Sequence, residues 1–158
     1  MAEAKVRELS VAEWRELARV GAALPVSITL DGDSMRPLIR RGLDRVTIVP
    51  LSRELLRGDV VLFEQPAGRY VVHRVRRLRA GQVQTLGDNC WNPDPWMDCS
   101  QVLGQAIAVE RDGRRIALNT APARTRGRVW MAARPVRCTW WRLKAKAGRG
   151  LRKLGLRK

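Results

Sequence analysis

The sequence predicts a single mostly β domain, and three observations support this fold class. The chain has 158 residues, which is enough for one domain of ordinary size with an apolar core. From residue 26 to residue 118, short segments rich in β-branched residues alternate with turn residues. Asp112-Gly113 is a strong hairpin signal between the last two of these segments. We therefore expect antiparallel strands joined by short turns.

A short helix is expected before the strands, over residues 11–20. Ser10 and Glu13 form a capping box at its start, and Gly21 is a plausible end. Four apolar residues of this segment share one helical face: Val11, Trp14, Leu17 and Ala18.

Seven segments have the length and composition of strands. They are Val26–Leu30, Arg45–Val49, Val60–Phe63, Tyr70–Val75, Gln82–Leu86, Val102–Glu110 and Arg114–Leu118. The chain thus divides into an N-terminal helical segment (1–24), a β domain (25–119) and a basic extension (120–158).

Four short motifs in the β region carry the functional signal. A serine lies in GDSMRP at residues 32–37, and the chain's only histidine lies in YVVHRV at residues 70–75. RGDVVLF, at residues 57–63, lies between them, and LGDN follows at residues 86–89. Any one of these motifs is common in turns and strands, so the information lies in the ordered set.

The order and spacing of the motifs resemble the catalytic region of the signal peptidase and SOS-repressor superfamily of serine peptidases. The resemblance extends over about residues 26–109. It implies coiled antiparallel sheets that form a partly open barrel. It also implies a serine endopeptidase that cleaves an extended peptide or precursor, with small residues preferred before the scissile bond.

A serine nucleophile requires a base, and the resemblance implies that Ser34 is the nucleophile and His73 its base. Other branches of the superfamily use lysine instead. The lysines of this chain all lie outside the matched region, at positions 5, 144, 146, 153 and 158. The ordinary pKa of histidine, about 6.5, suits a general base at neutral pH.

A carboxylate beside the histidine would fix its tautomer and stabilise the imidazolium. Asp88, in the LGDN motif, matches the family's acid and is the preferred candidate. Asp94 matches a second acidic position of the histidine-using branch and is the alternative.

Two departures from the family pattern affect the surroundings of Ser34. Histidine-type signal peptidases have a hydroxyl two residues before the nucleophile, where this chain has Gly32. The oxyanion hole would therefore depend on backbone N–H groups, that of Ser34 first. Gly42-Leu43-Asp44 replaces an uninterrupted Gly-Asp, which affects the local turn rather than the catalytic pair.

Four residues are candidates for substrate binding. Met35 and Pro37 belong to the serine motif, and Trp91 and Trp96 lie in the proline-containing loop that follows Asp88. The tryptophans could form the wall of a substrate groove. The alternative is that they fold back and fix the loop to the barrel.

The charge of +16 is concentrated in the C-terminal part of the chain. Residues 111–158 hold 16 basic groups and one acidic group, and residues 1–110 are nearly balanced. Tryptophans lie between the basic residues of the extension 120–158. This composition favours contact with an anionic membrane surface or an acidic partner, and nucleic acid less. A solvated tail whose tryptophans dock on the barrel is the alternative.

The sequence predicts a cytoplasmic protein, with the option of peripheral attachment to the inner face of the membrane. No stretch approaches the ~20 apolar residues of a membrane span, although signal peptidases have a membrane helix. The three cysteines, Cys90, Cys99 and Cys138, have no close spacing, so we expect no metal and no other cofactor. A Cys90–Cys99 disulfide is the alternative if the chain is exported.

Two other functions remain open at this point. The first is a non-catalytic module of the same fold that binds a peptide or partner. The second is a regulatory protein of repressor descent, although about 25 residues before the β domain are too few for a helix-turn-helix domain.

Overall fold

The structure, a computed structural model, describes residues 13–14, 16–17, 24–65 and 68–136. Its main feature is one open antiparallel sheet of eight strands. The elements are β1 (Val26–Thr29), β2 (Arg45–Pro50), β3 (Val60–Gln65), β4 (Arg69–Arg79), β5 (Gln82–Leu86), β6 (Met97–Asp98), the 3₁₀ turn η1 (Cys99–Gln101), β7 (Val102–Arg111), β8 (Arg114–Ala117) and α2 (Ala121–Ala132).

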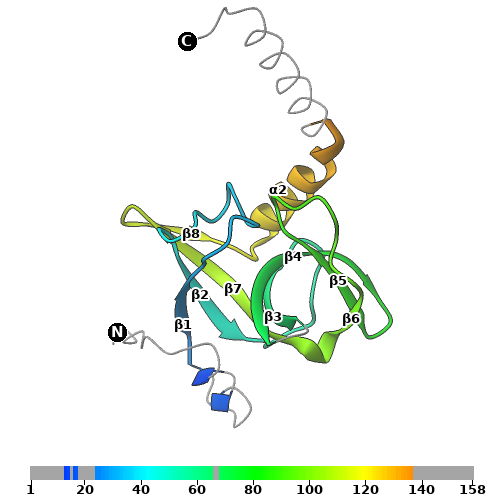
Figure 1. Ribbon diagram of the computed structural model, residues 1–158, viewed down its shortest axis with the longest axis horizontal. Helices are drawn as coiled ribbons and strands as arrows, with labels where there is room; N and C mark the ends of the chain where they lie inside the picture. The colour runs from blue at the N-terminus through cyan, green and yellow to red at the C-terminus, as the bar shows by residue number, and fades with distance from the viewer. Residues whose placement is uncertain (1–12, 15, 18–23, 66–67, 137–158) are drawn as a thin grey trace, which may run out of the picture. The chain divides into compact units, whose positions relative to one another are not determined.

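Strand β7 joins the two halves of the sheet. The strand order is β1-β2-β7-β3-β4-β5-β6, and β8 pairs with β7 outside this path. In Figure 1, β1 and β2 lie on one side of β7, and β3 to β6 lie on the other. The first half therefore comes from the chain before residue 51, and the second from residues 60–98.

The mostly β class and all seven expected strands are confirmed, with small differences at their ends. The hairpin at Asp112-Gly113 is also confirmed, since β7 pairs with β8 and both turn residues have positive φ, 50° and 73°. Strand β4 is longer than expected, and β6 was not expected because two residues give no periodic signal.

Apolar side chains are buried on both faces of the central strands. In β3, Val60 and Leu62 belong to one buried cluster, whereas Val61 and Phe63 belong to another. Neighbouring residues of a strand point to opposite faces, so both faces of β3 are covered. This explains why β3 is a continuous apolar run rather than an alternating one.

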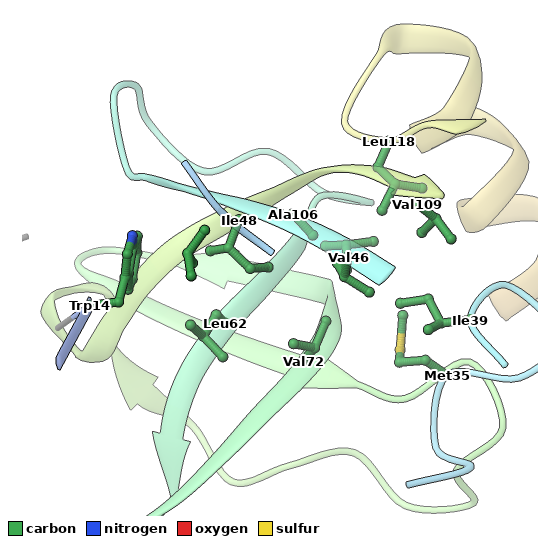
Figure 2. Close-up of a cluster of buried hydrophobic side chains, with 12 residues drawn as sticks. Trp14, Met35, Ile39, Val46, Ile48, Leu62, Val72, Ala106, Val109 and Leu118 are labelled. Carbon is green, nitrogen blue, oxygen red and sulfur yellow. The ribbon is translucent and has the colours of Figure 1, made fainter. Parts of the chain in front are cut away.

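The larger cluster extends from the N-terminal segment to the serine motif. Figure 2 shows Trp14 at one end of this cluster and Met35 and Ile39 at the other. Trp14 is fully buried and its indole N–H donates to Leu24 O at 2.9 Å. Residues 13–14 and 16–17 are helical, and the rest of the expected helix lies outside the described residues.

The basic extension begins with a helix, α2, that packs on the sheet. The sequence had predicted that the β domain ends at residue 119 and that the extension is separate from it. A β-carbon at Gly127 would lie 2.3 Å from Arg74 Nη1, so α2 touches this buried side chain closely. The compact unit that contains the sheet extends to Arg128. Among the described residues, no helix is long and apolar enough to cross a bilayer. Most of the expected surface-binding segment, residues 137–158, lies outside the described part of the chain.

Candidate active site

Ser34 lies in a turn that follows β1 and is fixed by buried neighbours. Met35 and Ile39 are both inserted into the larger cluster, and Ile39 N–H donates to Met35 O at 2.9 Å. Ser34 itself is half-buried. The apolar anchor immediately after the serine therefore holds the turn against the core and leaves the serine at its surface.

A buried carboxylate anchors the other end of the same loop. Asp44 is fully buried and accepts hydrogen bonds from Arg40 N–H, from the Arg40 side chain and from Arg111. Burial raises the pKa of Asp44, but the hydrogen bonds from Arg111 and Arg40 outweigh it and lower the pKa to about 2. The Gly42-Leu43-Asp44 segment thus places an ionised, buried aspartate at the end of this loop.

His73 is held in the middle of the sheet. It lies in β4 opposite Val61 of β3 and is only 6% exposed. Its ring packs against Phe63, with the ring centroids 6.0 Å apart. A histidine with so little freedom keeps a fixed orientation, which is what a positioned acid–base group needs.

Asp94 is the carboxylate that contacts His73. His73 Nδ1 lies 2.7 Å from Asp94 Oδ2, and the Thr85 hydroxyl donates to the same oxygen at 2.6 Å. Gln65 Nε2 donates to Asp94 Oδ1 at 3.3 Å. The loop that follows β5 returns along that strand, because Asp94 N–H donates to Thr85 O at 2.9 Å. The carboxylate is thereby brought over the histidine.

The environment of His73 stabilises its protonated form. Burial lowers the pKa of His73, but hydrogen bonds with Asp94 and Cys90 outweigh it and raise the pKa to about 9. Burial raises the pKa of Asp94, but the hydrogen bond between Asp94 and His73 and the other interactions of this carboxylate together outweigh burial and lower this pKa below its ordinary value. At neutral pH the resting state is therefore an imidazolium whose Nδ1–H donates to an aspartate.

The serine turn and His73 meet at Gly87. A β-carbon there would lie 2.7 Å from Ser34 O and 2.9 Å from His73 Nε2. Asn89 N–H donates to Ser34 O at 2.7 Å and Asn89 Nδ2 donates to Asp33 O at 3.2 Å, so two hydrogen bonds join the segments. Gly87 is required because any larger residue would separate them. Among the described residues, the Ser34 hydroxyl makes no hydrogen bond to His73, so a direct Ser34–His73 bond remains a prediction.

The preference for Asp88 as the partner of His73 is corrected by this geometry. Asp88 is 5% exposed and forms a bidentate pair with Arg74, at 2.8 Å from Nε and 2.7 Å from Nη2. Arg74 follows His73 in β4, and adjacent strand residues point to opposite faces. The aspartate of the LGDN motif therefore neutralises a buried arginine, and the alternative candidate, Asp94, contacts the histidine.

Two of the residues expected to bind substrate have other surroundings. Met35 is fully buried, so its side chain belongs to the core and is not available to line a groove, which corrects that expectation. Trp96 is half-buried, with the Arg79 guanidinium 4.1 Å above its ring, as expected for a tryptophan that fixes the loop. Pro37 and Trp91 are exposed, and their role as substrate contacts stays a prediction.

Cys90 is the residue near His73 that the sequence reasoning missed. A β-carbon at Gly87 would lie 2.6 Å from Cys90 Sγ, which places the thiol beside His73 Nε2. Cys90 and Cys99 are both free thiols, so the alternative of a disulfide between them does not hold. Among the described residues, no group of three His, Cys, Asp or Glu side chains is arranged to bind a metal ion. The position of Cys90 directly after the LGDN motif was the available signal.

Two comparisons with known proteins were without a match. No protein-family model matches the chain, and no curated protein matches it either.

Proposed function

We propose that the protein is a serine endopeptidase in which Ser34 is the nucleophile, His73 the general base and Asp94 the acid that orients the base. The proposal includes membership of the signal peptidase and SOS-repressor superfamily and its coiled-sheet fold. The observation that carries the proposal is the pair of His73 and Asp94, in which Nδ1 and Oδ2 lie 2.7 Å apart. The other ring nitrogen of His73, Nε2, faces the turn of Ser34.

In the proposed reaction, His73 in its neutral form takes the proton of the Ser34 hydroxyl as the oxygen attacks the peptide carbonyl. Asp94 stabilises the resulting imidazolium through the Nδ1–H. The backbone N–H of Ser34 donates to the oxyanion. The histidine then returns the proton to the leaving amine.

An extended peptide is the substrate class that the sheet supports. Strand β1 is the last strand on its side of the sheet order and leads into the Ser34 turn after four residues, Leu30 to Asp33. A peptide added to the edge of β1 would gain main-chain hydrogen bonds and would run beside the nucleophile. Maturation of a leader or precursor peptide is the activity of this type that we favour.

Replacing Ser34 with alanine is expected to abolish covalent labelling by a fluorophosphonate probe and hydrolysis of peptides with alanine before the scissile bond. The loss follows from removing the oxygen that attacks the substrate in the proposed reaction. Labelling is measured by in-gel fluorescence, and the modified residue is located by peptide mass spectrometry. The matched control is Ser100→Ala, an exposed serine in η1, which should leave labelling unchanged. Persistent labelling and turnover in Ser34→Ala would leave the non-catalytic binding module or another nucleophile as the function.

The pH dependence of labelling is expected to follow the pKa of His73, about 9. Only the neutral imidazole accepts the serine proton, so the labelling rate falls as the pH drops below this pKa. The rate increases as the pH rises towards it. Between pH 7 and pH 8.5 the rate should increase about tenfold per pH unit and then level off. Initial labelling rates across this range, with circular dichroism to check folding, provide the measurement. A labelling rate that falls only below about pH 6.5, the ordinary pKa of histidine, would contradict the raised pKa of His73.

A further inference from the structure

A second nucleophilic side chain lies at the same imidazole. His73 Nδ1 is occupied by Asp94, and the thiol of Cys90 is on the Nε2 side of the ring. Cys90 N–H donates to Gly87 O at 2.9 Å, and this turn directs the side chain back towards the histidine. The cysteine is half-buried and forms no disulfide.

These surroundings match those of reactive cysteines. Such cysteines are partly exposed and lie beside a histidine or another basic group, which stabilises the negative charge on sulfur. The contact with Cys90 is also one of the causes that raise the pKa of His73. The imidazole and the thiol are therefore coupled, and under the proposed function the Ser34 hydroxyl competes with this thiol for the same ring nitrogen.

We propose that Cys90 is a reactive thiol, that small disulfides modify it, and that this modification blocks the site around Ser34. The blocking part rests on the proposed peptidase function, whereas the reactivity of the thiol does not. In the modification, Cys90 Sγ forms a bond to one sulfur of the disulfide, and the S–S bond of the reagent breaks. The other half leaves as a thiol with the proton that Cys90 gives up, so the disulfide is the only oxidant.

The blocking effect follows from the space around Gly87. The point that a β-carbon would occupy is 2.6 Å from Cys90 Sγ, 2.7 Å from Ser34 O and 2.9 Å from His73 Nε2. A group attached to the sulfur therefore lies between the serine turn and the base. It removes the thiol from Nε2 and covers this nitrogen at the same time.

Cys99 provides an internal control for reactivity. It is also a half-buried free thiol, but it packs against the smaller apolar cluster. Both thiols are exposed to reagent in the same molecule. A difference between the alkylation rates of the two thiols therefore reports the effect of the neighbouring histidine rather than exposure alone.

The first experiment measures alkylation of the full chain by limiting iodoacetamide at pH 7, with each cysteine quantified by peptide mass spectrometry. We expect Cys90 to react at least about tenfold faster than Cys99, and the difference to disappear in urea. In His73→Gln, which retains a side chain of similar size, the rate at Cys90 should fall towards that of Cys99. Equal rates in the folded protein, or no effect of His73→Gln in a folded variant, would overturn the reactive-thiol assignment.

The second experiment treats the protein with glutathione disulfide and then follows fluorophosphonate labelling at Ser34. The wild type should lose labelling and recover it with dithiothreitol, whereas Cys90→Ala should retain the labelling of its own untreated sample. Labelling of Ser34 that persists when Cys90 is fully modified would overturn the blocking effect. If the untreated wild type is not labelled at all, the peptidase function fails, and the alkylation rates still decide whether Cys90 is reactive.

Discussion

Replacing Asp94 with asparagine is expected to lower the rate of fluorophosphonate labelling and peptide hydrolysis by about 10³–10⁴-fold. The carboxylate accepts from His73 at 2.7 Å and is the group that holds the ring and stabilises its charge. An amide of the same shape can still bind Thr85 and Gln65, so the fold should be retained. The measurement is the initial labelling rate at several pH values, together with the thermal unfolding midpoint.

The matched control for this variant is Asp98→Asn. Asp98 is an exposed aspartate in β6, directly after the loop that holds Asp94. It should keep the wild-type rate. An Asp94→Asn protein that is folded and labels at the wild-type rate would remove Asp94 from the catalytic group.

Replacing Asp88 with asparagine is expected to destabilise the fold by about 3–5 kcal/mol, because it leaves a buried arginine without its counter-charge. The side chains of Arg74 and Asp88 are 5% and 2% exposed, and the guanidinium also donates to Gly58 O at 2.8 Å. Arg74 is enclosed by Gly127 of α2, so it cannot move into solvent without displacing the helix. Urea unfolding at pH 7 measures the change.

The double variant Arg74→Met/Asp88→Leu provides the control for this pair. Removing both charges avoids the unpaired ion, so the double variant should lose less stability than Asp88→Asn alone. A stable Asp88→Asn protein with severely reduced turnover would instead restore Asp88 as the catalytic acid.

The strands could be predicted from the sequence because their signal is local. β-branched residues, turn residues and the Asp-Gly pair act within a few positions, and the seven segments were found at nearly their observed bounds. α2 was not predicted, because this segment holds Gly127 and several arginines and was interpreted as part of a basic, surface-binding extension. A glycine is needed at position 127 because α2 contacts Arg74 there, and Arg74 is far away in the sequence.

The approach of the serine turn to His73 could be predicted from the motifs, whereas the identity of the carboxylate that contacts His73 could not. Asp88 and Asp94 both follow β5, the strand that pairs with the histidine-bearing β4. The outcome depends on which face of β4 each aspartate reaches, and His73 and Arg74 occupy opposite faces. The burial of Met35 and the position of Cys90 likewise depend on packing around Ile39 and Gly87, which no local pattern reports.

The central position of β7 has a consequence for the order of events during synthesis. β1 and β2 pair with each other, and β3 to β6 form a continuous set of neighbours, but only β7 pairs with both β2 and β3. Ser34 belongs to the first group of strands, and His73 and Asp94 belong to the second. While the ribosome has released the chain only as far as residue 101, Ser34 and His73 are carried by two strand groups that no strand yet joins. β7 is the strand that pairs with both groups, so the Ser34 turn and His73 are expected to come together only once residues 102–111 have been made, before β8 completes the sheet.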